Sequence, residues 1–175
     1  MPARCSIAAL NAMDAEGFTS LLGGVFEHSP WIARAAYAGR PFGSVAELHA
    51  AMLHVVDDAG ADRQLRLLQA HPMLAPINGV TLTAASAAEQ AGIGLHRLAA
   101  DEGAMMQALN RAYRDRFGFP FIIAVRGQRD RAAILAALQA RVGNVPSQER
   151  TTALAEVAKI ARFRLDDLIA EGNDA

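Results

Sequence analysis

The sequence predicts an all-α fold, a single-domain bundle of about eight helices spanning residues 1–175. Three observations lead to this prediction. Apolar residues recur at every third or fourth position through most of the chain, which is the spacing of one helix face. Ser, Thr or Asp residues precede several of these runs at N-cap positions. No segment convincingly alternates apolar and polar residues in the way a half-buried strand does.

Four helices are expected in the first half of the chain, because each of four apolar runs follows residues that favour a helix start. Ser and Asp side chains can accept a hydrogen bond from the first turn, and proline fits the first helical position. The start residues are Asp14, Ser29 with Pro30, Ser44 with Glu47 as a capping box, and Asp62. The fourth helix is expected to end near Ala70.

Four more helices are expected in the second half. Their start residues are Thr83, Asp101, Asp130 and Pro146. One side of the second of them is expected to carry Met105, Leu109, Ala112 and Tyr113. The stretch "RFGFPFIIAVRG", residues 116–127, differs from these helices because a glycine and a proline interrupt its apolar residues. We expect it to be either a buried connector or the wall of a pocket.

Composition excludes several classes of function. The net charge of −1, from 17 basic and 18 acidic residues, gives no reason to expect binding to nucleic acid or to a membrane surface. Cys5 is the only cysteine, so a disulfide within the chain is impossible, which suits a reducing cytoplasm. No apolar stretch is long enough to span a bilayer or to act as a signal peptide. No motif of histidine or cysteine ligands is present, so no metal is expected.

His71 is the histidine whose position most suggests chemistry. It lies between the end of a predicted helix and Pro72, at the mouth of a loop. Imidazole titrates near neutral pH and therefore suits proton transfer. A histidine at a helix C-terminus can also simply interact with the helix dipole. The residues alone leave both interpretations open.

A polar stripe is predicted on the helix that follows Thr83. Ser86, Glu89 and Gln90 are spaced i, i+3 and i+4, while most other positions of this helix are alanine or glycine. Small neighbours would let a ligand approach, and a hydroxyl, a carboxylate and an amide could bind a small polar heterocycle. The alternative is an ordinary solvated helix face, which is the more common use of such a stripe.

Two arginines of "KIARFRLDDL" lie close to the face of the last helix that is expected to be buried. Arg164 is adjacent to this face, and Arg162 points further round the helix. Either guanidinium could hold a substrate carboxylate through two hydrogen bonds. Either could instead pair with a nearby acid such as Asp166 or Asp167, or extend its charged end to solvent.

Several segments, in this order and spacing, closely resemble the ureidoimidazoline decarboxylases of urate breakdown. They are "FEHSPWIARAAYAGRPF", "AHPML", "LTAASAAEQAGIGL", "LNRAYRDRFGFPFIIAVRG" and "ALAEVAKIARFRLDDL". The likeness covers residues 18–168, and "HP", "SxxEQ" and "FGFPF" together form a specific combination. The resemblance implies an all-α homodimer that needs no cofactor. It also implies conversion of 2-oxo-4-hydroxy-4-carboxy-5-ureidoimidazoline (OHCU) to (S)-allantoin and CO2.

The resemblance also implies roles for individual residues. His71 and Glu89 would handle protons, and Arg164 would bind the carboxylate or oxyanion. The residues expected to line the substrate site are Pro72, Ser86, Gln90, Phe119, Phe121, Ile122, Ile123, Ala124 and Val125. The segment 121–125 would offer backbone N–H and C=O groups to the ring and its ureido arm.

The chain departs from the family pattern in one loop. It has "HPMLAPI" where many relatives have "HPDLAGK", so Met73, Pro76 and Ile77 replace an acid, a glycine and a lysine. This departure motivates a second hypothesis, a helical small-molecule-binding protein that keeps the pocket but has lost or altered turnover. A third hypothesis is a purely structural or dimerisation module, in which His71, Glu89 and Arg164 would not meet.

Overall fold

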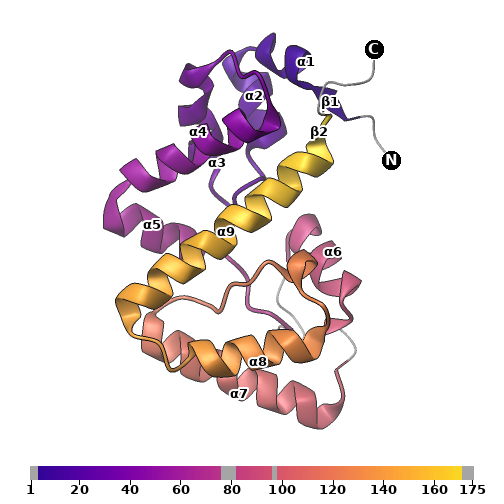
Figure 1. The fold of residues 1–175 in the computed structure, drawn as a ribbon, viewed down its shortest axis with the longest axis vertical. Helices are drawn as coiled ribbons and strands as arrows, with labels where there is room; N and C mark the ends of the chain where they lie inside the picture. Colours follow the sequence, from indigo (N-terminus) through magenta and orange to yellow (C-terminus); the bar gives the residue numbers. More distant parts are fainter. Residues whose placement is uncertain (1–3, 76–81, 96–97, 171–175) are drawn as a thin grey trace. The chain divides into compact units, whose positions relative to one another are not determined.

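The computed structural model describes residues 4–75, 82–95 and 98–170, and within these ranges the protein is mostly helical (Figure 1). Its α-helices there are α1 (Ile7–Asn11), α2 (Ala15–Leu22), α3 (Pro30–Ala36), α4 (Val45–Asp58), α5 (Gly60–Gln69), α6 (Ala84–Gly92), α7 (Ala100–Phe117), α8 (Arg131–Arg141) and α9 (Pro146–Leu168). The described residues also include the short 3-10 helices η1 (Tyr37–Gly39) and η3 (Val125–Gly127). The predicted all-α class is confirmed.

Contacts divide the chain into two compact units. Unit 1 consists of Met1–Leu67 and Ala158–Ala175, and unit 2 of Leu68–Val157. Helix α9 therefore contributes its first half to unit 2 and its second half to unit 1. That both units belong to one domain stays a prediction. In the ranges that the structure describes, no helix is both long and apolar enough to cross a bilayer.

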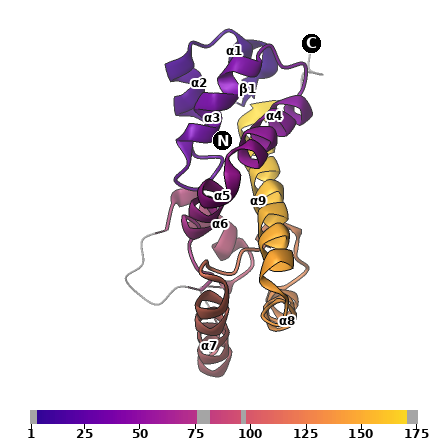
Figure 2. The same cartoon turned by 90° about the vertical axis from the view of Figure 1, so that its left-hand side faces the viewer.

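Unit 1 is built around α2, α3 and α4, which lie together in Figures 1 and 2. Phe18 is fully buried, and its ring packs edge-on against Tyr37 with centroids 5.5 Å apart. The same ring stacks at 6.3 Å on Phe42. A minimal parallel sheet joins the ends of this unit, because β1 (Cys5–Ser6) pairs with β2 (Ile169–Ala170). This sheet escaped prediction because two residues are too few to produce a strand pattern.

Most of the helix starts follow the predicted chemistry. Asp14 accepts a hydrogen bond from the Gly17 N–H at 2.8 Å, and Ser44, Thr83 and Asp130 cap their helices in the same way. The hydrogen bond that the Asp130 carboxylate accepts from the Ala133 N–H also lowers the Asp130 pKa. Two starts were placed one or two residues too late, since α5 begins at Gly60 and α7 at Ala100.

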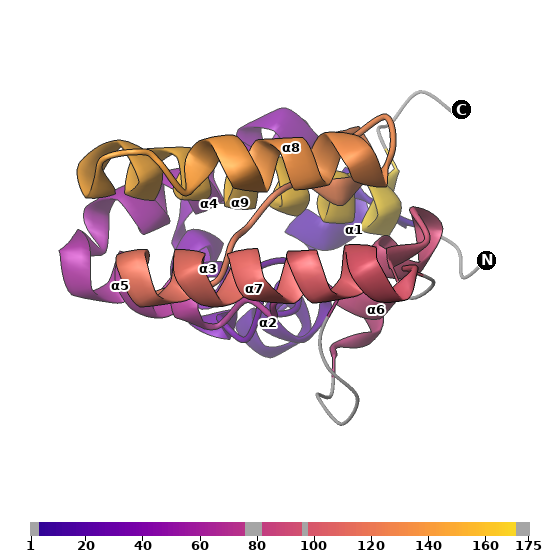
Figure 3. The same ribbon diagram turned by 90° about the horizontal axis from the view of Figure 1, so that it is seen from below.

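Unit 2 contains α6, α7, α8 and the first half of α9. Figure 3 shows α7 and α8 as neighbouring helices. The face of α7 that is buried consists of Met106, Asn110 and Tyr113, and Met105 is 48% exposed. The prediction was right for Tyr113 and wrong for Met105, because a polar residue, Asn110, occupies a buried position on this helix.

The segment between α7 and η3 is buried and not helical. It is therefore the buried connector that was one of the two alternatives for residues 116–127. Gly118 ends α7 with φ = +77°, a left-handed conformation that favours glycine. Phe119 and Phe121 then pack edge-on against the Tyr113 ring, with centroids 5.9 and 5.3 Å away. The chain consequently passes through the interior of unit 2 in an open conformation that exposes its own peptide groups to neighbouring side chains.

Candidate functional site

The loop that carries His71 is held by two side-chain amides. His71 is 7% exposed and donates its backbone N–H to the Leu68 carbonyl at the end of α5. Gln90 accepts a hydrogen bond from the Ala75 N–H at 2.9 Å and donates one to the Met73 carbonyl at 3.2 Å. Asn110 donates to the Leu74 carbonyl at 2.9 Å. The loop therefore has a defined position despite the unusual residue at Met73; Pro76 and Ile77 lie outside the described residues.

Two members of the polar stripe predicted on helix α6 are buried in the protein. Ser86 is 4% exposed and Gln90 is 6% exposed, while Glu89 is partly exposed. Thr83 sets this orientation locally by capping the helix. A solvated face would leave these side chains in water, so the structure disfavours that interpretation. The stripe is instead a buried polar surface, which needs hydrogen-bonding partners.

The segment 121–125 is buried throughout, with each of its residues 8% exposed or less. Among the described residues, two charged side chains bond to its peptide groups. Arg141 donates to the Ile122 carbonyl at 2.8 Å, and Glu156 accepts from the Ala124 N–H at 2.8 Å. Within the part of the chain that the structure describes, neither the N–H nor the C=O of Ile123 has a partner. A buried peptide group in this state can bind a ligand.

A surface hollow of about 420 Å³ lies beside His71. Its lining residues are Gln69, His71, Met73, Arg114, Gly118, Phe119 and Pro120. Of the predicted site residues, only His71 and Phe119 contribute to this hollow. It therefore lies next to the loop that carries His71, on the side formed by the end of α7.

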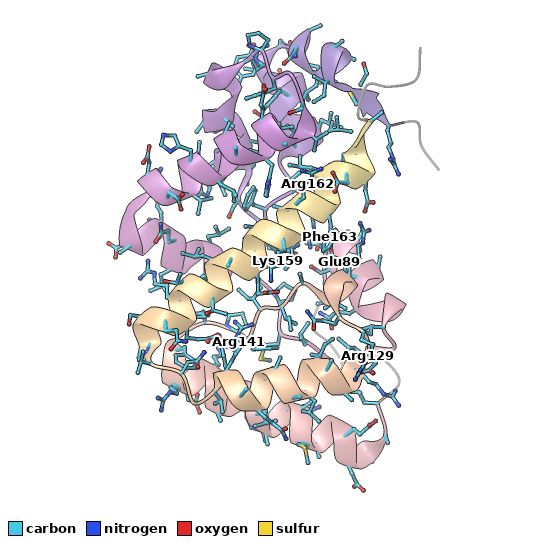
Figure 4. The ribbon with its side chains drawn as sticks, viewed as in Figure 1. Glu89, Arg129, Arg141, Lys159, Arg162 and Phe163 are labelled. Atoms are coloured by element: carbon cyan, nitrogen blue, oxygen red, sulfur yellow. The ribbon has the colours of Figure 1, made fainter. Side chains whose placement is uncertain are left out.

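A buried charge network stands behind the segment 121–125. Arg141, at the end of α8 (Figure 4), bonds to one oxygen of Glu149 through Nε at 2.9 Å and Nη2 at 2.6 Å. Tyr113 donates its hydroxyl to the same oxygen, and Asn144 donates to the other at 2.7 Å. Burial raises the Tyr113 pKa, and the bond to Glu149 raises it further. The Arg141 guanidinium also lies 4.6 Å from the Phe121 ring centroid.

Arg164 and Arg162 have different environments in unit 1. Arg164 is 7% exposed, and its Nη1 lies 2.8 Å from a carboxylate oxygen of Glu27. The same nitrogen donates longer bonds of 3.4 Å to the carbonyls of Gly24 and Val25. Arg162 instead pairs with Asp166 at 2.8 Å on a half-exposed face. Of the two arginines, only Arg164 is buried against a carboxylate.

The structure thus gathers most of the predicted site in one unit. The His71–Pro72 loop, the buried face of α6 and the segment 121–125 all belong to unit 2. Gln90 bonds α6 to the loop, and α6 also contacts η3, which begins at Val125. Arg164 belongs to unit 1, where it pairs with Glu27. Convergence of Arg164 with His71 and Glu89 stays a prediction.

Three polar residues that organise these regions were missed from the sequence: Glu27, Asn110 and Arg141. Asn110 had a detectable signal, since it stands four residues after Met106 on an otherwise apolar face. Glu27 directly follows the apolar pair Val25–Phe26, which could have marked it as buried. Arg141 resembles any basic residue in the last turn of a helix and carries no such signal.

Metal binding has no support among the described residues, where no group of three or more His, Cys, Asp or Glu side chains is placed to hold an ion. His49 illustrates the ordinary use of a histidine here. Its Nε2 lies 2.9 Å from the Ala158 carbonyl, and burial lowers its pKa.

Comparisons with known proteins agree on one family. Residues 11–166 match the family model described as OHCU decarboxylase. The 2-oxo-4-hydroxy-4-carboxy-5-ureidoimidazoline decarboxylase of Haloferax volcanii is 44% identical over 160 residues, which are 91% of this chain and 94% of that protein. The uric acid degradation bifunctional protein of Bacillus subtilis is 43% identical over 162 residues, which are 93% of this chain and 32% of that protein.

The fold is also similar to that of a solved protein. The crystal structure of an (S)-allantoin synthase superposes with a TM-score of 0.71 at 35% identity, covering 94% of this chain. The match covers 54% of that solved chain, so this chain spans about half its length.

Proposed function

Because this chain belongs to the OHCU decarboxylase family, we infer that it is a carbon–carbon lyase that decarboxylates OHCU in urate breakdown. We propose (S)-allantoin and CO2 as its products, with His71, Glu89 and Arg164 as the residues that carry the reaction. One observation supports the proposal most strongly. The polar face of α6 is buried and is bonded through Gln90 to the loop that carries His71.

The substrate supplies its own electron sink. When the bond between the ring carbon and the carboxylate breaks, the electron pair moves into the neighbouring C=N bond, and CO2 leaves. The ring nitrogen takes up a proton, and the former hydroxyl carbon is now an enol. Loss of the enol O–H proton and delivery of a proton to the adjacent carbon give the ketone form of allantoin. The enzyme must therefore move protons and choose one face of the ring.

His71 and Glu89 suit these proton transfers. The imidazole and carboxylate are the two common acid–base groups, and positioned acid–base help contributes roughly 10²–10⁴-fold to a rate. Ser86, Gln90 and Pro72 would line the ring, and the peptide groups of residues 121–125 would bind its amide edges. Phe119 and Phe121 would provide an apolar wall on which a charged carboxylate is less favourable than neutral CO2.

Arg164 would hold the carboxylate or the developing oxyanion, since a guanidinium is the natural partner of such groups. Its pairing with Glu27 fixes one nitrogen of the guanidinium and makes the pair neutral overall. A neutral pair would bind the substrate's carboxylate less tightly than a lone cation would. That is useful in a decarboxylase, because tight binding of the ground-state carboxylate would not speed the reaction.

The homodimer and the cytoplasmic location belong to this proposal; the first rests on the family resemblance and the second on the single cysteine, Cys5. No cofactor is proposed, because the electron sink is in the substrate. The runner-up is a small-molecule-binding protein with altered turnover, motivated by the replaced residues at Met73, Pro76 and Ile77. The bonds from Gln90 and Asn110 to residues 73–75 favour the enzyme, because they hold the described part of this loop in place.

The test is stereochemical. OHCU is generated fresh from urate by upstream enzymes, the protein is added, and the circular dichroism of the allantoin is followed. Spontaneous decay gives racemic allantoin, so only an (S)-enriched signal reports catalysis. We expect rapid formation of (S)-allantoin and a loss of roughly 10²–10⁴-fold in rate for His71→Ala.

The matched control is His54→Ala, because His54 is exposed and pairs with Asp58 on the surface of α4. It should retain the wild-type rate and stereochemistry. Racemic product at the uncatalysed rate from the folded wild-type protein would instead support the binding protein.

A further inference from the structure

Two backbone groups of the segment 121–125 form hydrogen bonds with charged side chains of opposite sign. Arg141 donates to the Ile122 carbonyl, and Glu156 accepts from the Ala124 N–H, each at 2.8 Å. Both side chains are largely buried, with Arg141 12% and Glu156 8% exposed. The two bonds therefore act in a medium where charge-assisted hydrogen bonds are strong.

These two bonds flank a single residue. The Ile122 carbonyl and the Ile123 N–H are the two ends of one peptide group, and the Ile123 carbonyl and the Ala124 N–H are the two ends of the next. In a trans peptide the N–H and C=O point in opposite directions, and both of these peptides are trans. Arg141 and Glu156 thus occupy the outer ends and leave the two inner ends, both on Ile123, pointing elsewhere.

The charges also change the strength of those inner ends. A cation bonded to a carbonyl draws electron density from the peptide and makes its N–H a better donor. A carboxylate bonded to an N–H does the reverse and makes the carbonyl of that peptide a better acceptor. Ile123 is 6% exposed, and neither end has a partner within the described residues. A strengthened donor and a strengthened acceptor are therefore available on the same residue.

We propose that Arg141 and Glu156 are positioning residues that clamp the segment 121–125 and present the N–H and C=O of Ile123 to the substrate. The clamp rests on the proposed function of this site. Its ligand class is a group with an adjacent carbonyl and N–H, such as an amide or ureido group, which can pair with both ends at once. Neither charged residue touches the substrate in this account; each acts through the peptide it holds.

Arginine is required at position 141 because this side chain contacts three groups at once: a carboxylate, a backbone carbonyl and an aromatic ring. Its fork reaches Glu149 through Nε and Nη2 and Ile122 through Nη1, while its flat face covers Phe121. A lysine has the charge but has only one nitrogen and no planar face. Glu149, which is fully buried, accepts from Tyr113 and Asn144 as well and so keeps the arginine fixed.

The experiment compares Arg141→Lys with Arg116→Lys. Arg116 is a matched control because it also donates to a backbone carbonyl, that of Asn144, and lies 5.5 Å from a phenylalanine ring centroid, that of Phe117. It is exposed and makes no described contact with the segment 121–125. Two readouts are used: KM and kcat for OHCU, and the ¹H and ¹⁵N chemical shifts of the Ile123 amide with and without (S)-allantoin.

For Arg141→Lys we expect KM to rise about tenfold, kcat/KM to fall by roughly 10–100-fold, and the Ile123 amide resonance to move in the ligand-free protein. Arg116→Lys should match the wild type in all three. A merely structural role for Arg141 would lower the folded fraction but leave KM and the Ile123 shift of the folded protein unchanged, and that result would overturn the proposal. If Arg141→Lys does not fold, Glu156→Gln tests the other grip in the same way.

The outcomes for the wild-type protein separate the clamp from the reaction. Racemic product together with an Ile123 amide that shifts with (S)-allantoin, and shifts less in Arg141→Lys, would overturn the reaction and support the clamp. An Ile123 amide that does not respond to saturating (S)-allantoin would overturn the clamp, whatever the product.

Discussion

Among the described residues, an arginine–glutamate pair is buried in each of the two units, and the two pairs are built differently. In unit 2, Glu149 receives four hydrogen bonds from Arg141, Tyr113 and Asn144. In unit 1, Arg164 meets Glu27 through Nη1, and the same nitrogen donates two bonds of 3.4 Å to backbone carbonyls. A 3.4 Å bond is at the weak end of hydrogen bonding.

The pairs also differ in the sequence separation between their two residues. Arg141 and Glu149 are 8 residues apart, whereas Glu27 and Arg164 are 137 apart. The first pair closes the short turn between α8 and α9 and is surrounded by aromatic rings. The second ties the loop after α2 to the second half of α9. We therefore expect the Arg141–Glu149 pair to hold the segment 121–125 rigidly in place and the Glu27–Arg164 pair to contribute mainly to the orientation of Arg164.

The largest expected effect comes from breaking the first pair. Glu149→Ala leaves Arg141 nearly buried without its counter-charge, and loss of one partner of a buried pair costs about 3–5 kcal/mol. Urea unfolding followed by far-ultraviolet circular dichroism measures this loss. Asp166→Ala is the control, because it breaks an Arg162 pair of similar length whose side chains are 35% and 40% exposed. That pair should contribute at most about 1 kcal/mol, and equal losses in both variants would refute the assignment.

Breaking the second pair should affect catalysis more than stability. Glu27→Gln keeps the volume and an acceptor oxygen but removes the charge that orients Arg164. We expect kcat/KM for OHCU to fall roughly 10–100-fold, as small misplacements of catalytic groups do, while the protein remains folded. Steady-state kinetics against Glu16→Gln, an exposed residue of α2, provide the comparison. A kcat/KM within twofold of the wild type would remove Glu27 from the proposed function.

The smallest effect is a pH dependence specific to the first pair. The Tyr113 pKa is raised in the folded protein by burial and then by Glu149, so the unfolded chain loses this proton first. Its contribution to stability is present below pH 10 and is lost as the pH rises above 10, by at most about 1.4 kcal/mol per pH unit. Urea unfolding between pH 8 and 11 should show this slope in the wild type and in Tyr37→Phe. Tyr113→Phe should flatten it, and an unchanged slope there would contradict the prediction.

The same contrast explains what the sequence could reveal. The caps at Asp14, Ser44, Thr83 and Asp130 were predictable because each acts on a residue three positions away. The family resemblance singled out Arg164 over Arg162, and the burial of Arg164 is consistent with that choice. Its partner Glu27 was not predictable, because no local rule relates residues that far apart.

The buried face of α7 is another feature that the sequence pattern predicted only in part. An apolar pattern assigns polar residues to solvent, so Asn110 shifted the predicted face toward Met105 and Leu109. The residue is buried because its amide serves the loop after α5 rather than its own helix. Local pattern therefore fails where a side chain bonds to another part of the chain, which is also where the proposed site lies.

The loop that carries His71 has a feature with consequences for how such a site can change. Gln90 and Asn110 bond only to main-chain atoms of residues 73–75, and never to their side chains. The side chain at position 73 can therefore be exchanged without loosening this anchorage, as the methionine here in place of an acid illustrates. For protein engineering, the position is one where a library of side chains could explore new substrates while the histidine stays where it is.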